Sequence, residues 1–91
     1  MKRIHAIISG VVQGVGFRFY TKYLAERFEL NGYVRNRQDG TVELEAEGPE
    51  EAVSGFLHEL EEGQPRAAHI SGIEVDEIPA AGDLSGFGIR R

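Results

Sequence analysis

The spacing of apolar residues changes within the first third of the chain. Between residues 3 and 12, apolar side chains recur at every second position, with Ile4, Ala6 and Ile8 on one face. This alternation predicts a β-strand that ends at the glycines that follow. From residue 19 to 30 the apolar spacing is helical, and we expect Asn31-Gly32 to terminate that helix.

Two further strands and a tight turn are predicted in the middle of the chain. Residues 33–38 are typical of a strand, and Asp39-Gly40 is a strong turn signal. Residues 41–47 then alternate strictly, with three apolar side chains opposite a threonine and three glutamates. We therefore expect this strand to have one buried face and one solvent-exposed face.

A second helix and two more strands complete the pattern. Gly48-Pro49 breaks the preceding strand and opens a helix. The apolar stripe of this helix consists of Val53, Phe56, Leu57 and Leu60. Residues 69–78 are predicted to form a strand interrupted by Gly72, and residues 87–91 a short final strand.

The predicted order of elements, β-α-β-β-α-β plus a short extra C-terminal strand, indicates an α+β fold. Each helix has one apolar stripe, so we expect a mainly antiparallel sheet that both helices cover on one face. This architecture is the ferredoxin-like sandwich. Its right-handed crossover makes the first two strands parallel, so the bend after Val12 and the end of strand 33–38 should be neighbours.

Length and composition favour one small globular domain that spans residues 1–91. The chain has 41% hydrophobic and 27% charged residues, as soluble proteins do. No apolar run reaches the ~18 residues of a membrane helix, and the N-terminus is a poor secretory signal. These features favour a cytoplasmic protein with no membrane partner. No apolar residues are left over for an oligomer interface, which favours a monomer.

The cysteine, histidine and charge content exclude several classes of function. There is no cysteine, hence no disulfide, thiolate metal site or cysteine nucleophile. The histidines at positions 5, 58 and 69 lack ligand-like spacing, so we expect no metal site. The net charge of −5 argues against a nucleic-acid partner.

The charge is unevenly distributed along the chain. Residues 13–37 hold five basic and two acidic side chains, a net charge of +3. Residues 38–91 hold three basic and thirteen acidic ones, a net charge of −10.

The bend between the first strand and the first helix lies in this basic stretch. Gly14 and Gly16 can adopt positive φ, so that successive amides form an anion-binding nest ahead of a helix N-terminus. Arg18 adds a planar fork of donors that suits phosphate or carboxylate. The residues alone fit either a small-oxyanion site or an ordinary glycine-rich bend with an exposed arginine. They match neither nucleotide-binding glycine fingerprint.

Asn36 is polar where the alternation predicts an apolar residue, because it shares a face with Val34. A buried amide needs hydrogen-bond partners. Asn36 either bonds to neighbouring backbone at the strand end or holds a ligand or a water beside Arg18. The predicted topology brings Arg18 and Asn36 to the same edge of the sheet, and both interpretations stay open.

Two motifs resemble the signatures of the acylphosphatase family. The first is GVVQGVGFR at residues 10–18, and the second is GYVRNRQDGTVELEAEG at residues 32–48. Both match in full, in the right order and at the right separation. The resemblance covers nearly the whole chain, and residues 63–85 are its least diagnostic part.

The resemblance implies an enzyme that hydrolyses acyl phosphates to a carboxylate and inorganic phosphate. It implies that Asn36 orients the attacking water, and that Arg18 and the backbone amides of the bend bind the phosphoryl group. These phosphate-binding residues are Gln13, Gly14, Val15, Gly16, Phe17 and Arg18. The implied partner is a small-molecule acyl phosphate, and the resemblance implies no metal and no organic cofactor.

Three alternatives share this topology. A non-catalytic small-anion-binding or regulatory module would use the same bend without turnover. The chain could also be an acylphosphatase-like domain of a larger carbamoyl-transfer maturation protein, although Met1 and the final strand favour a free-standing chain. An RNA-binding module would need exposed aromatic residues on the central strands, where residues 41–47 carry glutamates instead.

Overall fold

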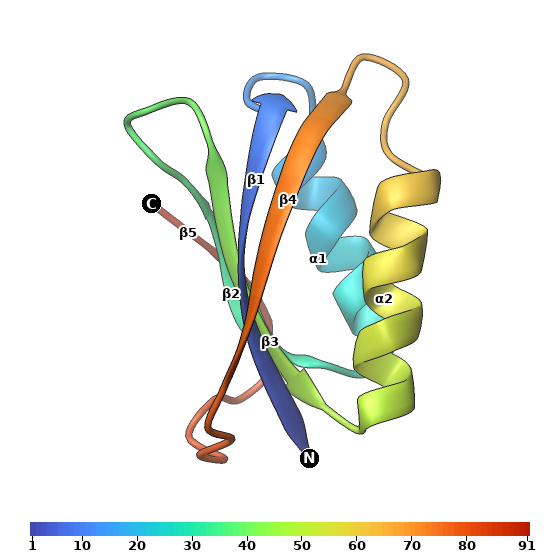
Figure 1. The fold of residues 1–91 in the computed structure, drawn as a ribbon, viewed down its shortest axis with the longest axis vertical. Coiled ribbons are helices and arrows are strands. Elements are labelled where there is room, and N and C mark those ends of the chain that lie inside the picture. The colour runs from blue at the N-terminus through green and yellow to red at the C-terminus, as the bar shows by residue number, and fades with distance from the viewer.

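The computed structural model describes residues 1–91, with helices and strands in the predicted order (Figure 1). The strands are β1 (Lys2–Val11), β2 (Asn31–Asn36), β3 (Val42–Gly48), β4 (His69–Ile78) and β5 (Phe87–Arg90). The helices are α1 (Phe17–Arg27) and α2 (Glu50–Glu62). The ferredoxin-like α+β prediction is confirmed.

The five strands form one sheet in the order β4-β1-β3-β2-β5. β1 is antiparallel to β3 and β4, whereas β2 is antiparallel to β3 and parallel to β5. Because β3 lies antiparallel between β1 and β2, these two strands are parallel to each other, as predicted. Both helices lie on one side of the sheet (Figure 1). The carboxyl ends of β1 and β2 therefore lie at the same edge.

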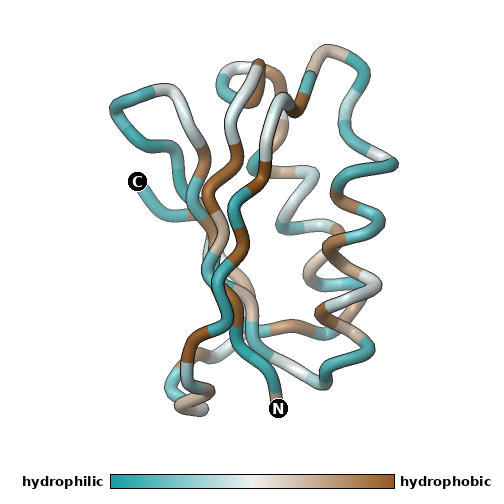
Figure 2. Tube along the Cα trace, in the orientation of Figure 1, coloured by the Kyte–Doolittle hydropathy of each residue, from teal (hydrophilic) through white to brown (hydrophobic).

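The core fills the layer between this sheet and the two helices. Ile4, Ala6 and Ile8 of β1 are buried, as their alternation predicts. Of the predicted α2 stripe, Val53, Phe56 and Leu60 are buried and Leu57 is partly buried against them. Figure 2 shows the apolar residues distributed along the strands and the helices that enclose this layer.

The end of α1 differs from the prediction. Asn31-Gly32 does not terminate the helix, because both residues belong to β2. Instead, Glu29 adopts a left-handed φ of 57°, and the Leu30 N–H donates to the Ala25 carbonyl at 2.9 Å. This is the Schellman arrangement, usually formed with glycine. The burial of Leu30 in the core offsets the unfavourable conformation of Glu29.

The other boundaries lie within two residues of the predicted ones. Helix α1 begins at Phe17, two residues early, and β2 begins at Asn31, also two residues early. The strand β4 covers residues 69–78, as predicted. None of the helices is both long and apolar enough to span a membrane.

The face of β3 that was predicted to be solvent-exposed is largely covered. Glu47 is only 2% exposed, and the side chains of Glu43 and Glu45 are 15% and 16% exposed. Charged side chains of neighbouring strands and of the loop before β5 lie over them. We call this group the open-face network; it comprises Arg3, His5, Arg35, Glu43, Glu45, Glu47 and Asp83.

Hydrogen bonds in the open-face network shift the pKa values of its members. Burial acts to raise the pKa of Glu43, but hydrogen bonds from His5 and Arg35 outweigh it and hold that pKa below its usual range. The hydrogen bonds of Arg3 to Glu45 and then to Asp83 raise the pKa of Arg3. The charged forms are therefore the ones that the native fold favours.

Candidate active site

Three hollows open on the protein surface, and one of them is formed by the glycine-arginine bend. The largest, about 320 Å³, is lined by Arg35, Arg37, Gln38 and Asp39. The second, about 290 Å³, lies between the end of α2 and the start of β4. The third, about 160 Å³, is lined by Val12, Gly14, Gly16, Phe17, Arg18 and Phe19.

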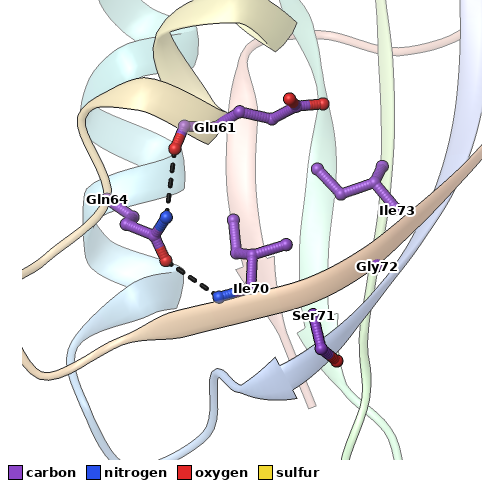
Figure 3. Close-up of a pocket in the computed structure, with 6 residues that line it drawn as sticks. All are labelled: Glu61, Gln64, Ile70, Ser71, Gly72 and Ile73. Atoms are coloured by element: carbon purple, nitrogen blue, oxygen red, sulfur yellow. Dashed lines mark hydrogen bonds between the residues drawn. The ribbon is translucent and has the colours of Figure 1, made fainter.

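In each of the two larger hollows, a polar side chain of the lining is paired within the chain. Figure 3 shows that the Gln64 amide donates to the Glu61 carbonyl at 3.0 Å and accepts from the Ile70 N–H at 2.9 Å. Gln64 thus joins the end of α2 to the start of β4. In the largest hollow, Arg35 is bonded to Glu43 of the open-face network. Size alone therefore does not identify the functional site.

The bend has the backbone conformation that its glycines predict. Gly14 and Gly16 adopt φ values of 74° and 79°. A Cβ atom added at either glycine would meet nothing within 4 Å, so backbone conformation and not crowding requires glycine there. Gly16 is also the N-cap of α1. Left-handed residues on both sides of Val15 are typical of the turns from which amide nests are built.

The amides of the bend have no acceptor within the chain. Tyr20 donates the first backbone hydrogen bond after β1, to the Gly16 carbonyl at 3.1 Å. The N–H groups from Gln13 to Phe19 donate to no backbone or side-chain oxygen. Four free amides are ordinary at a helix N-terminus, but here the free amides extend backward through the bend. The positive end of the α1 dipole lies at the same place.

Arg18 lies in the first turn of α1 and lines the hollow of the bend. It is partly buried and forms no ion pair with any acidic side chain. A guanidinium group beside free amides provides a continuous set of hydrogen-bond donors. Such a set is complementary to a tetrahedral oxyanion.

Asn36 is the last residue of β2 and pairs with Val42 of β3. Its Oδ1 atom is buried and has no hydrogen-bond partner in the chain. One of the two interpretations from the sequence requires a hydrogen bond between the Asn36 side chain and neighbouring backbone. The Oδ1 atom forms no such bond. An unpaired buried acceptor is rare in native proteins and calls for an explanation.

The Gln13 side chain joins the bend to the end of β2. Its Nε2 donates to the Arg37 carbonyl at 2.7 Å and to the Thr41 carbonyl at 2.8 Å. Arg37 directly follows Asn36, and its own N–H donates to Thr41 at 2.9 Å. The predicted proximity of the bend and the β2 end is thus confirmed.

The sequence predicts a role in the site only for the backbone amide of Gln13. It does not predict the hydrogen bonds of the Gln13 side chain. The partners of this side chain are carbonyl groups 24 and 28 residues away. No local spacing reveals such a contact. The only signal was the topology, which predicts that the two segments meet.

The assembled groups are suited to anion chemistry. Amides and a guanidinium provide donors, and the Asn36 Oδ1 atom provides an acceptor that can orient a water molecule. No three His, Asp or Glu side chains lie together as a metal-binding group. Donors arranged in this way can stabilise negative charge that spreads over phosphoryl oxygens.

Comparison with known proteins relates the whole chain to one family. The sequence model described as Acylphosphatase matches residues 4–89. The acylphosphatase of Salinibacter ruber is 47% identical over 90 residues, which cover 99% of this chain and 94% of that protein.

Solved structures give the same relation. The crystal structure of acylphosphatase from Bacillus subtilis superposes with a TM-score of 0.95 at 35% identity, over 100% of both chains. The structure of T. kodakarensis HypF superposes with a TM-score of 0.88 at 37% identity, over 100% of this chain and 12% of that one. The same fold therefore also occurs as a small part of a longer protein.

Proposed function

This chain belongs to the acylphosphatase family and hydrolyses acyl phosphates, and from that premise we propose that Arg18, the amides of the bend and Asn36 carry out the reaction. One observation carries the proposal. Free amides, a guanidinium without an ion pair and an unpaired buried oxygen lie on segments joined by Gln13. With relatives named as acylphosphatases matching nearly the full length, a non-catalytic anion-binding module is set aside.

The bend and Arg18 hold the phosphoryl group of the substrate. The amides of residues 13–18 donate to its oxygens, and the Arg18 fork binds two of them. Phosphoryl transfer passes through a loose transition state in which negative charge spreads over these oxygens. Donors that are already fixed in place stabilise this charge without reorganisation.

Asn36 orients the attacking water from the end of β2. Its Oδ1 accepts a hydrogen bond from the water, which satisfies the unpaired buried acceptor. The water oxygen attacks phosphorus in line with the acyl oxygen, the bond between phosphorus and that oxygen breaks, and its electron pair leaves on the carboxylate. The proton lost by the water passes to a phosphoryl oxygen.

The leaving group explains why these residues are sufficient. A carboxylic acid has a pKa of about 4, so the carboxylate departs at neutral pH without being protonated. No general acid is needed, and the chain has no histidine in the bend or at the end of β2. Gln13 acts as a positioning residue, because it fixes the distance between the bend and the strand that carries Asn36.

We also propose that the protein is a cytoplasmic monomer that acts without metal or organic cofactor. Its composition and its single core cluster support one domain over residues 1–91. Its acidic surface supports selectivity for small anions, because residues 38–91 repel larger polyanions.

The test is a phosphate-release assay on benzoyl phosphate with purified protein, with and without a chelator. We expect turnover that the chelator leaves unchanged and that inorganic phosphate inhibits competitively. Crystals grown with phosphate should show the anion within ~3.2 Å of at least three amides of the bend. An anion bound in the hollow of Arg35 and Arg37, with the bend empty, would contradict the proposal.

A further inference from the structure

Phe19 is a large apolar side chain left in solvent beside the candidate active site. It is 69% exposed and lines the same hollow as Gly14, Gly16 and Arg18. Its ring pairs with no other aromatic ring, in contrast to Phe17, which packs against Tyr20. Core packing therefore does not account for a phenylalanine at this position.

The size of the hollow limits what it encloses. Its volume of about 160 Å³ is below the roughly 300–1,000 Å³ of pockets that enclose drug-sized ligands. A phosphoryl group fits inside, but a bulky acyl group does not. Because the acyl group is covalently attached to the phosphoryl group, it must lie at the rim, where Phe19 is the exposed apolar side chain.

We propose that Phe19 contacts the acyl group of the substrate and makes the enzyme favour acyl phosphates with an aromatic or bulky apolar acyl group over acetyl phosphate. This inference rests on the proposed function, because it requires the phosphoryl group to lie between the bend and Arg18. Phe19 directly follows Arg18 in the first turn of α1. A substrate anchored by the arginine is therefore held next to the phenyl ring.

The in-line course of the reaction agrees with this placement. The water and the leaving oxygen lie on opposite sides of phosphorus. Asn36, which orients the water, belongs to β2 and is not among the residues that line the hollow. Phe19 belongs to a different element, α1, and lines the hollow. The inference therefore requires the acyl group on the Phe19 side of phosphorus and the water on the Asn36 side.

Tyr23 provides a matched control on the same helix. It lies four residues after Phe19, on the same helical face, and is 59% exposed. It does not line the hollow, and its ring faces the Arg27 guanidinium at 5.8 Å. Its removal deletes a similar exposed aromatic surface away from the substrate.

The experiment compares kcat/KM for benzoyl phosphate with kcat/KM for acetyl phosphate. In Phe19→Ala the benzoyl-to-acetyl ratio should fall about three- to tenfold, mostly through KM for benzoyl phosphate, as expected for one aromatic contact. Phe19→Tyr and Tyr23→Ala should keep the wild-type ratio. Inhibition by inorganic phosphate should be unchanged in all variants, because phosphate has no acyl group.

An unchanged ratio in Phe19→Ala would overturn the inference, as would an equal fall in Tyr23→Ala. Equal losses on both substrates would also overturn it, because they would assign Phe19 to the conformation of the bend. Failure of the proposed function has a different signature. In that case phosphate would not compete with either substrate in the wild-type enzyme, whatever the ratio.

Discussion

On the open face of the sheet Arg3 donates to Glu45, Glu47 and Asp83, whereas Arg18 in the first turn of α1 pairs with no acidic side chain. The same contrast extends to the neighbours of each arginine. Glu47 accepts from Arg3 and from two backbone amides, of Ala81 and Gly82. In the bend, by contrast, the backbone donors have no acceptor.

This contrast separates two uses of polar groups. In the open-face network, each charge meets an opposite charge, so the groups are not free to bind a ligand, and removing one partner leaves the other uncompensated and destabilises the fold. At the bend the free donors are available to a ligand, and at the neighbouring end of β2 the orphaned buried acceptor Asn36 Oδ1 costs about 1–3 kcal/mol. Substitutions at the bend should therefore change activity, and substitutions in the network should change stability.

The largest effect is expected for Arg18→Lys. Lysine keeps the positive charge but loses the bidentate fork, so kcat/KM should fall by at least about 10³-fold and phosphate inhibition should weaken. The free energy of unfolding should change by less than about 0.5 kcal/mol, because no hydrogen bond or ion pair within the chain is lost. Steady-state kinetics and urea unfolding measure the two quantities. A lysine variant with near-normal turnover would show that charge alone is sufficient.

Asn36→Ala should lower kcat by about 10²- to 10³-fold, because the water loses its orienting acceptor. Phosphate should inhibit at a similar concentration, since the bend and Arg18 remain.

Asn31→Ala is the matched control at the other end of β2, where the Asn31 Oδ1 accepts from the Gly86 N–H at 2.8 Å. That control should lose stability and keep kcat. If Asn36→Ala is the less stable variant and turns over normally, Asn36 is a structural amide.

Glu47→Ala should lower the stability and leave the activity nearly unchanged. Its effect in free energy should be the smallest of the three substitutions. It removes a 2% exposed carboxylate, leaving Arg3 and two loop amides without that acceptor, and we expect a loss of about 2–3 kcal/mol of unfolding free energy. The kcat/KM of the folded variant should stay within about twofold of wild type. Glu50→Ala, which removes a more exposed partner of Lys2 at 4.0 Å, is the control and should change stability little. A Glu47 variant with wild-type stability would remove the contrast between the two regions.

Much of the fold could be predicted because it depends on local periodicity. The alternation of apolar residues around Ile4 predicts one buried face of β1, and the apolar stripe around Phe56 predicts one buried face of α2. Because Asn36 lies on the same face of the strand as Val34, the sequence correctly predicted a buried polar atom at the end of β2. The glycines of the bend correctly predicted positive φ at Gly14.

The errors arose where distant residues decide the outcome. The glutamates of β3 alternate as a solvent-exposed face should, but Arg3 covers Glu45 and Glu47 from more than 40 residues away. The end of α1 depends on Leu30 entering the core, which overrides the turn signal of Asn31-Gly32. Neither effect is visible in a local window of sequence.

The two hydrogen bonds of Gln13 also have a consequence for how the chain acquires its activity during folding. They connect the Gln13 side chain to carbonyl groups 24 and 28 residues further along the chain, beyond α1 and β2. Contacts between distant segments form only after the intervening loops have closed, which is the slow part of folding. A chain with both helices formed but the β1-β3-β2 pairing incomplete has the glycines and Arg18 without Asn36 beside them. Recovery of enzymatic activity therefore reports the completed topology and not the formation of helices.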